Sequence, residues 1–454
     1  MFFAFILFFF LTRVLTNFIY KLPFNLYCGD SAFYIHLAQN LNLAAADRPS
    51  GYPFILSFLL PELFNNLGLI TIFQILFSFV VFVCFLFVFR KIVKKNILIL
   101  SLLLIFFNSL SIFLERSVMA ESISYNLLIV CFLFLSINKN YNLYLTFLIG
   151  LLCGIFPILR TNYLVFSFLF LFLFINSSFI KNRLSIKFFI NLFAVFIGFF
   201  VVFYGYIFLF VSPRLNVNKI SSFGGRTLFS RVMVFSDCND LVNIPNQNYL
   251  TNSLYKNCDN EDIKNYSVNI FSSDGIINKT DNELKHERAL SDGLYLDISK
   301  VLIFKNPKIV VQILNQSIRD TFLATSSFFE QNTYSSLGGG CEAIPEKFNI
   351  LESDLVGISV NKENIFVRYY LYLSTITQKI LVFCFIVVIP IYFIIKLFST
   401  RFLLFLKKYY LPIVIWVLSV AYFMISLLFT GFDYRYIHPL WFMLFLILYY
   451  LGKH

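Results

Sequence analysis

The most regular feature of this chain is a series of long apolar runs separated by short polar stretches. An apolar run of about 17 to 25 residues is long enough to cross the hydrocarbon core of a bilayer as a helix. The pattern therefore predicts an all-α polytopic membrane protein with about ten transmembrane helices. The predicted spans cover residues 2–20, 69–89, 97–114, 122–137, 143–159, 163–180, 188–211, 380–397, 411–430 and 438–451.

The composition supports this class. Of the 454 residues, 59% are hydrophobic, 62 are Phe and only 13% are charged. A soluble domain cannot bury that much apolar surface, so the chain belongs in a bilayer. The first apolar run has no basic segment before it and no clear small-residue cleavage site, so we expect a retained helix rather than a signal peptide.

The charges predict an orientation, because Lys and Arg in short loops favour the cytoplasmic side. With the N-terminus inside, the inner rim collects most of the short-loop Lys and Arg and none of the Asp and Glu. The formal net charge of +12 therefore reports on orientation and does not indicate a nucleic-acid partner. We expect a multi-pass protein of the plasma (inner) membrane, surrounded by membrane lipid, with both termini cytoplasmic.

Two polar segments divide the chain. Residues 1–211 form a seven-span core with a first outer loop at 21–68, residues 212–379 form a small extracytoplasmic domain of mixed composition, and residues 380–454 add three spans. In an oxidising exterior, Cys238 and Cys258 could close a disulfide, but Cys341 is a rival partner and the sequence leaves the pairing open. The outward cysteines are Cys28, Cys238, Cys258 and Cys341.

The first outer loop carries an apolar stripe at helical spacing, which predicts an amphipathic helix on the membrane surface with Asp30 at its start. An Asp at that position is also an ordinary N-cap. The prolines and glycine within residues 49–53 predict a rigid turn that leads back to the second span. The stripe consists of Tyr34, Leu37, Ala38 and Leu41.

Other charged residues gather on the same predicted face, where charges near hydrocarbon are costly and often functional. For the arginines, the alternative is an interfacial side chain that reaches towards water. For Glu115 and Arg116, the alternative is a simple surface pair, and tyrosines at span ends often form an aromatic belt. These charged residues are Glu115, Arg116, Glu121, Arg160, Asp433 and Arg435.

Five segments carry a resemblance to a known family. "GDSAFYIHLAQNL", "RPSGYPFILSFL", "RSVMAESISYNLL", "GLLCGIFPILRTNYL" and "FDYRYIHPLWFMLFL" together resemble the membrane glycosyltransferases of the GT-C type. That group includes protein mannosyltransferases and aminoarabinose transferases. The resemblance covers the seven-span core and the last outer loop, and it leaves residues 212–379 unexplained.

The resemblance implies a site. Asp30 stands where the family has a catalytic carboxylate, and Glu121 stands where it has a second acidic residue. Arg160 matches a basic residue after the fifth span, and Arg435 with Tyr436 matches a basic–aromatic pair before the last span.

The implied reaction is an inverting transfer of a sugar from a polyprenyl-phosphate donor to a glycolipid, polysaccharide or protein acceptor. Asp30 would act as the base, and Glu121 would orient either the acceptor or the partners of Asp30. Arg160 and Arg435, with Arg116 as a weaker candidate, would face the phosphate. Many relatives have paired acids where this chain has Gly29-Asp30, so the sequence does not require a metal and the cofactor stays open.

Two other classes remain as alternatives. A surface polysaccharide polymerase or ligase would place its essential arginines in the long outer segment, at Arg214, Arg226 or Arg231. A lipid-linked sugar transporter would carry charges buried within its spans and paired repeats. Apart from Arg13, the interiors of the predicted spans carry no charge, which counts against transport.

Overall fold

The structure of the chain is a computed structural model that describes most, but not all, of its residues. It describes residues 2–16, 30–39, 49–63, 68–137, 142–182, 185–215, 224–242, 244, 249–258, 275–284, 288–323, 365–430 and 434–452. These residues form helices and no strand. The predicted all-α class is therefore confirmed.

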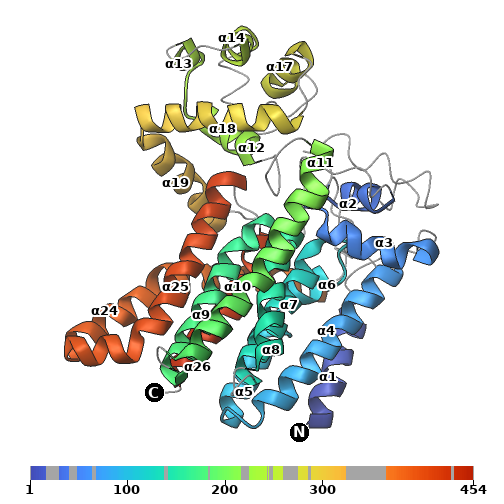
Figure 1. The fold of residues 1–454 in the computed structure, drawn as a ribbon, viewed down its shortest axis with the longest axis vertical. Helices are drawn as coiled ribbons and strands as arrows, with labels where there is room; N and C mark the ends of the chain where they lie inside the picture. Colours follow the sequence, from blue (N-terminus) through green and yellow to red (C-terminus); the bar gives the residue numbers. More distant parts are fainter. Residues whose placement is uncertain are drawn as a thin grey trace.

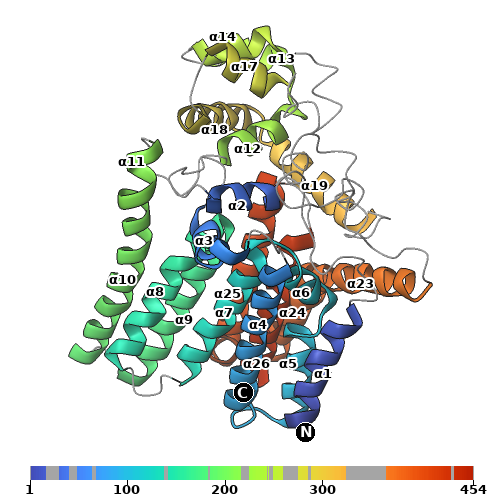
Figure 2. The same cartoon turned by 90° about the vertical axis from the view of Figure 1, so that its right-hand side faces the viewer.

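The apolar helices form one bundle (Figures 1 and 2). Short 3-10 segments η2 (Thr161–Tyr163) and η6 (Tyr434–Tyr436) precede two of these helices, and two π-helical turns, η3 (Ile207–Val211) and η5 (Cys384–Val388), interrupt others. The bundle consists of α1 (Phe2–Leu15), α4 (Gly68–Phe89), α5 (Lys95–Ile105), α6 (Ser109–Glu115), α7 (Ala120–Ile137), α8 (Leu143–Leu159), α9 (Leu164–Asn182), α10 (Ile186–Tyr206), α11 (Ser212–Leu215), α23 (Ile365–Phe383), α24 (Ile389–Ser399), α25 (Phe402–Thr430) and α26 (His438–Gly452).

The bundle contains fewer long spans than the sequence predicts. Within the described residues, five helices are long and apolar enough to cross a membrane, or six if α5 and α6 count as one bent span. Four more apolar helices are shorter than the bilayer core is thick. A helix of 13 to 17 residues is only about 20 to 25 Å long, whereas the hydrocarbon core is about 30 Å thick. The shorter ones are Phe3–Leu15, Leu143–Leu159, Thr161–Ser177 and His438–Gly452.

The predicted span at 97–114 is broken. Helices α5 and α6 meet at an angle of 50°. The side chain of Asn108 supplies hydrogen bonds to backbone groups on both sides of the break. It donates to the carbonyl of Leu104 and accepts from the backbone N–H of Ser111. The Ser111 hydroxyl and the Tyr125 hydroxyl both donate to the Ile105 carbonyl. Non-helical backbone at membrane depth is tolerated when its polar groups are satisfied in this way.

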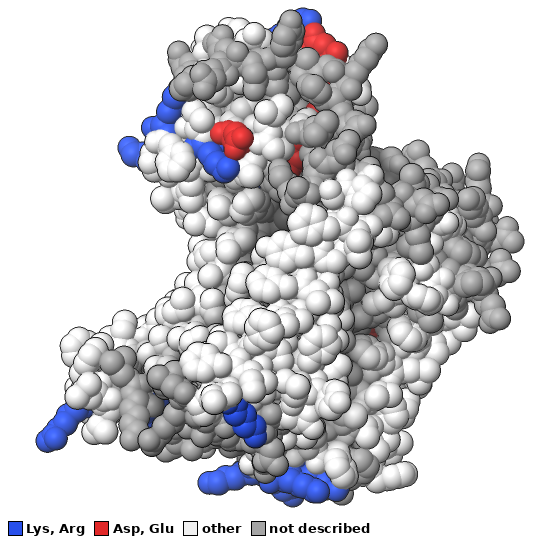
Figure 3. All heavy atoms as spheres, in the orientation of Figure 1, with Lys and Arg blue, Asp and Glu red and all other residues white. Residues whose placement is uncertain are grey.

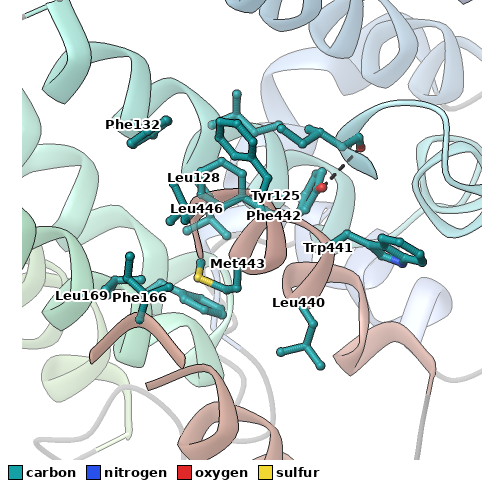
Figure 4. Close-up of a cluster of buried hydrophobic side chains, with 14 of the residues drawn as sticks. Tyr125, Leu128, Phe132, Phe166, Leu169, Leu440, Trp441, Phe442, Met443 and Leu446 are labelled. Carbon is teal, nitrogen blue, oxygen red and sulfur yellow. Dashed lines mark hydrogen bonds between the residues drawn. The ribbon is translucent and has the colours of Figure 1, made fainter. Parts of the chain in front are cut away.

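Helix α26 forms the centre of the bundle. It is apolar around its whole circumference, and its side chains are buried from His438 to Tyr449 with few exceptions. Figure 4 shows Leu440, Trp441, Phe442, Met443 and Leu446 among side chains from α7 and α9. A helix that is apolar on all sides is typically surrounded by other helices. Because its neighbours cover it, α26 does not need the full length of a lipid-facing span.

Helices α8 and α10 touch through glycines. A Cβ atom added at Gly150 would lie 2.2 Å from the Val195 carbonyl oxygen, and one at Gly198 would lie 2.5 Å from that of Phe147. Small residues let two membrane helices approach until their backbones meet. The crossing fixes α10 against the rest of the bundle through α8.

The first outer loop folds into two helices, α2 (Asp30–Gln39) and α3 (Gly51–Leu63), which lie across one end of the bundle (Figures 1 and 2). A helix is present at the predicted position, and Tyr34, Leu37 and Ala38 of its predicted stripe are buried, whereas Leu41 lies outside the described residues. The stripe packs on α3 and the bundle rather than on lipid.

The predicted turn at 49–53 is wrong, because α3 begins at Gly51. Pro53 lies in its first turn, where a helix needs no backbone N–H donor. A Cβ at Gly51 would lie 2.7 Å from the Ile158 carbonyl oxygen, so the start of α3 packs directly on the end of α8. The Ser50 N–H also donates to the Tyr206 hydroxyl of α10, at 2.9 Å.

The described part of residues 212–379 adds a second layer of helices above that end (Figure 1). These helices have their own apolar core, which includes Phe229, Tyr295 and Ile313. Helix α19 leads from this layer to the bundle, where its Ser317 hydroxyl donates to the Leu427 carbonyl of α25. The layer consists of α12 (Gly224–Met233), α13 (Cys238–Val242), α14 (Tyr249–Lys256), α17 (Ile276–Leu284), α18 (Arg288–Lys305) and α19 (Lys308–Leu323).

A disulfide joins Cys238 to Cys258. It connects the start of α13 to the turn that follows α14 and confirms one of the pairings that the sequence leaves open. Cys28 and Cys341 lie outside the described residues.

Charged side chains are distributed unevenly along the bundle (Figure 3). On the face shown, Lys and Arg lie at the lower end, a broad belt above them is almost free of charge, and both signs occur in the upper layer. The lower end includes the turn between α4 and α5, where Arg90, Lys91, Lys94 and Lys95 are exposed. An uncharged belt is the surface that a bilayer requires. The protein is therefore an all-α multi-pass membrane protein.

Candidate functional site

A buried ion pair joins the start of α7 to the end of α8. Glu121 is the second residue of α7, and Arg160 directly follows α8. The two helices run in opposite directions, so these ends meet at the end of the bundle beneath α2 and α3 (Figure 2). Arg160 Nη1 lies 2.7 Å from Glu121 Oε1, and the side chains are 9% and 1% exposed.

Arg435 and Tyr436 complete this group from η6, just before α26. Arg435 Nη1 lies 3.8 Å from the same Glu121 oxygen. The guanidinium carbons of Arg160 and Arg435 each lie 5.3 Å from the centre of the Tyr436 ring. At that distance, a guanidinium is attracted to an aromatic ring. We call Glu121, Arg160, Arg435 and Tyr436 the Glu121 cluster.

The Glu121 cluster carries one negative and two positive charges in a buried setting. Among the described residues, neither carboxylate oxygen of Glu121 accepts a well-oriented hydrogen bond. Guanidinium groups that share one carboxylate keep further N–H donors that can bind other oxygen atoms. The arrangement therefore suits an anionic ligand that brings oxygen atoms to the arginines.

Tyrosines line this end of the bundle. The Tyr34 and Tyr52 rings meet edge to face with centroids 5.1 Å apart, and Tyr163 meets Tyr422 in the same way at 6.2 Å. All four are buried, so the expectation of an aromatic belt at the membrane surface is wrong for Tyr34, Tyr52 and Tyr163. Burial, followed by the neighbouring Tyr34 and Glu121, raises the pKa of the Tyr52 hydroxyl well above its usual value. Tyr52 therefore remains a neutral hydrogen-bond donor.

The turn before Glu121 is held by polar side chains from two helices, α3 and α4. Gln74 Nε2 donates to the carbonyls of Glu115 and Ser117, at 3.1 and 2.8 Å. Gln74 in turn accepts from the Tyr52 hydroxyl at 3.3 Å. These bonds fix the backbone that leads into α7. Sequence reasoning missed Gln74, although an amide in the middle of an apolar run was a visible signal.

Asp30 begins α2, next to this turn. The hydroxyl of the following residue, Ser31, donates to the Val118 carbonyl at 2.9 Å, three positions before Glu121. The structure thus brings the start of α2 to the start of α7. The side chain of Asp30 lies outside what the structure describes, so its predicted role as a base stays a prediction.

Glu115 does not pair with Arg116. Arg13 reaches Glu115 from α1 through two bonds, from Nε to Oε2 at 2.9 Å and from Nη2 to Oε1 at 2.7 Å. Arg13 Nη2 also donates to the Phe106 carbonyl, and its guanidinium lies 3.7 Å from the centre of the Phe9 ring. The predicted surface pair is therefore wrong, because a buried arginine from a distant span binds the carboxylate.

Arg116 points towards α1. It is 3% exposed, and its Nη1 donates to the Thr16 hydroxyl at 3.2 Å. Arg160 is also buried, at 8% exposed. Neither side chain therefore reaches out to the membrane interface, and of the predicted arginines it is Arg160 and Arg435 that share the Glu121 carboxylate.

A second polar group lies deeper in the bundle. His438 Nε2 is 2.8 Å from the Ser111 hydroxyl, and its ring stacks on Tyr125 with centroids 3.8 Å apart. These three residues, with Glu115 and Ser122, line a cavity of about 10 Å³. That volume holds about one water molecule. No group of His, Cys, Asp and Glu side chains within the described ranges could hold a metal ion.

Comparisons of the chain with models of protein families, with curated protein sequences and with solved structures found no match. The fold and the site thus define the protein as an all-α multi-pass membrane protein with a buried carboxylate–arginine cluster at one end of its bundle.

Proposed function

We propose that this protein is a membrane glycosyltransferase that moves a sugar from a polyprenyl-phosphate donor to an acceptor at the end of the bundle that holds the Glu121 cluster. One observation carries the proposal. Three separate connections in the chain place Glu121, Arg160 and Arg435 together, beneath the first-loop helix that begins with Asp30. The sequence resemblance assigns roles to the same residues.

The arginines suit the leaving group. As the sugar departs, negative charge develops on the lipid phosphate, and fixed cations in a dry site stabilise that charge. A planar guanidinium binds phosphate oxygens through paired donors and stays charged when it is buried. Arg160 and Arg435 are held in place by Glu121 and Tyr436, so they need little reorganisation during the reaction.

The chemistry at the sugar is a single displacement. The acceptor hydroxyl or amine attacks the anomeric carbon, its proton passes to the Asp30 carboxylate, and the bond from that carbon to the phosphate oxygen breaks. The electron pair leaves with the lipid phosphate, and the configuration at the anomeric carbon inverts. Glu121 holds the two arginines in place. A glycolipid, a polysaccharide or a protein can supply the acceptor group, and a divalent metal remains an open cofactor.

The proposal includes a topology of about ten crossings in the plasma (inner) membrane. The four shorter apolar helices then also cross, and around α26 neighbouring helices replace lipid. The exposed Lys and Arg between α4 and α5 favour the cytoplasmic side. The start of α1 and the end of α26 lie at that same end in Figure 1, so both termini are cytoplasmic. The Glu121 cluster and the upper layer then face the exterior.

The arginines of the upper layer favour the transferase over a polysaccharide polymerase or ligase. Arg226 Nη2 lies 2.5 Å from Asp281 Oδ2 and 2.6 Å from the Ser291 hydroxyl. Arg231 Nη2 donates to the Ser317 hydroxyl at 2.6 Å. Both arginines are buried in the packing of this layer, which suits a structural role. The side chain of Arg214 lies outside the described residues.

One observation favours a lipid-linked sugar transporter as the second candidate. The Arg13–Glu115 pair is buried between α1 and the break that separates α5 from α6. Buried charges beside a broken helix are typical of transport sites. A transporter would move intact labelled lipid-linked sugar between leaflets without cleaving the sugar–phosphate bond, and a transferase would release lipid phosphate.

The experiment compares two arginine variants of the purified protein in liposomes. A labelled undecaprenyl-phosphate sugar is supplied with extracts of candidate acceptors, and labelled product is counted. We expect Arg160→Gln to lose at least about a hundredfold in transfer rate, because removing one preorganised charge stabiliser costs about 2.7 to 4 kcal/mol. The control, Arg90→Gln, changes an exposed arginine at the opposite end and keeps full activity. Equal activity in the two variants would overturn the proposal.

A further inference from the structure

The hydroxyl of Tyr163 is buried without a hydrogen bond among the described residues. Tyr163 ends η2, and its backbone N–H donates to the Arg160 carbonyl at 2.9 Å. Its ring is wedged edge to face between Phe166, with centroids 5.1 Å apart, and Tyr422, at 6.2 Å. The side chain therefore cannot turn away, and its unsatisfied hydroxyl belongs to a fixed part of the site. A buried polar group without a partner is rare and calls for an explanation.

Glu121 is a second buried side chain whose polar atoms lack hydrogen bonds. Its two carboxylate oxygens also lack well-oriented hydrogen bonds within the described part of the chain, although Arg160 lies beside them. The charges of Glu121 and Arg160 both act on the Tyr163 hydroxyl. A carboxylate can only accept, whereas a tyrosine hydroxyl can donate and accept. A ligand group that satisfies both at once must donate to the carboxylate, and one that also accepts can take the proton of the tyrosine hydroxyl as well.

A sugar hydroxyl has that property, and a phosphate dianion does not. A phosphate oxygen accepts from the arginines, but a bare phosphate offers no donor to the Glu121 carboxylate and is repelled by its charge. The cluster, together with Tyr163, therefore offers binding groups for two different parts of a ligand. Arg160 and Arg435 suit the phosphate, and Glu121 with Tyr163 suits a neutral hydroxyl next to it.

We propose that Glu121 and Tyr163 bind a hydroxyl of the sugar that is transferred, so that the site recognises a sugar phosphate and discriminates against the lipid phosphate alone. This inference rests on the proposed function. It also supplies a reason for product release: after transfer, the remaining lipid phosphate leaves both groups unsatisfied, which weakens its binding.

The test measures the affinity of the purified protein in nanodiscs for four probes. These are undecaprenyl phosphate and undecaprenyl phosphate bearing glucose, galactose or mannose. We expect the wild-type protein to bind at least one sugar-bearing probe about tenfold more tightly than undecaprenyl phosphate, as one or two satisfied hydrogen bonds would give. Tyr163→Phe should reduce that preference about fivefold and leave the affinity for undecaprenyl phosphate unchanged.

Two further variants make the outcomes distinguishable. Tyr204→Phe removes a tyrosine hydroxyl from the exposed side of α10 and should change nothing. Arg160→Gln should weaken binding of all four probes. If Tyr163→Phe keeps the full preference, or if the wild type shows no preference for any sugar-bearing probe, the inference is wrong. If Arg160→Gln leaves the affinity for undecaprenyl phosphate unchanged, the proposed function itself is wrong.

Discussion

Replacing Glu121 by Gln would test the electrostatics of the site. The substitution keeps the size of the side chain and removes the one negative charge of the Glu121 cluster. Two guanidinium groups would then remain around the Tyr436 ring, with Arg160 and Arg435 losing a carboxylate oxygen at 2.7 and 3.8 Å. The variant should therefore be destabilised when no ligand is bound.

The size of this effect follows from the geometry. At an effective dielectric constant of 20, two unit charges 3.8 Å apart interact by about 4 kcal/mol. Breaking a buried ion pair by removing one partner costs about 3 to 5 kcal/mol, because the other charge is left uncompensated. We therefore expect Glu121→Gln to lower the free energy of unfolding by about 3 to 5 kcal/mol.

The assay is unfolding by a denaturing detergent in mixed micelles, followed by tryptophan fluorescence. The chain has two tryptophans, and both donate hydrogen bonds within the bundle: Trp416 to the Phe385 carbonyl and Trp441 to Gln378. Glu115→Gln is the matched control for burial, because it breaks the Arg13 pair and should cost a similar amount. Glu283→Gln is the control for an exposed pair, with Lys256, and should cost much less than either buried substitution.

Ligand binding separates the two buried pairs. Glu121→Gln leaves the site more positive, so undecaprenyl phosphate should bind it more tightly than it binds the wild type, whereas Glu115→Gln should not change that affinity. The reasoning would be refuted if Glu121→Gln cost no more than Glu283→Gln, or if it weakened binding of undecaprenyl phosphate.

Three more predictions concern the scaffold. Gly150→Ala should destabilise the α8–α10 crossing by about 1 to 3 kcal/mol through overpacking, whereas Gly205→Ala, with nothing within 4 Å, should be neutral or slightly stabilising in the same unfolding assay. Cys238→Ser should lower the stability of the upper layer by about 3 kcal/mol, seen as faster proteolysis there, and unchanged proteolysis would contradict a structural role for the disulfide. Hydrogen bonds from Lys256, Ser253 and Asn257 lower the pKa of Glu283 to about 2, so the contact between α14 and α17 should be fully stable above the unfolded pKa of 4.5 and weaken as pH falls towards 2. Hydrogen exchange in α17 should report this loosening, and Glu283→Gln should abolish the pH dependence.

The sequence predicts the helices and the meeting of the charged ends well, for a physical reason. Consecutive apolar helices alternate in direction, so the start of α7, the end of α8 and the start of α26 must lie at the same end of the bundle. This alternation alone predicts that Glu121, Arg160 and Arg435 lie at one end of the bundle, without knowledge of how the helices pack. The local pattern around Tyr34 and Ala38 likewise predicts α2, because helical periodicity is a short-range signal.

The features that the sequence does not predict depend on tertiary packing. Arg13 and Glu115 are separated by 102 positions, and their pairing follows from how α1 packs beside the break at Asn108. The apolar run across that break reads as one span because side-chain hydropathy does not report backbone direction. The number of long spans was also overestimated, since the length of an apolar run does not show whether lipid or other helices will surround it, as α26 illustrates.

The central claim is best tested by separating binding from chemistry at Asp30. Purified wild-type and Asp30→Asn proteins would be compared for binding of a labelled undecaprenyl-phosphate sugar and for its transfer to acceptor. The account predicts unchanged donor binding and at least about a hundredfold slower transfer in the variant, because a positioned general base contributes a factor of about 10² to 10⁴. Transfer by Asp30→Asn at the wild-type rate would contradict it.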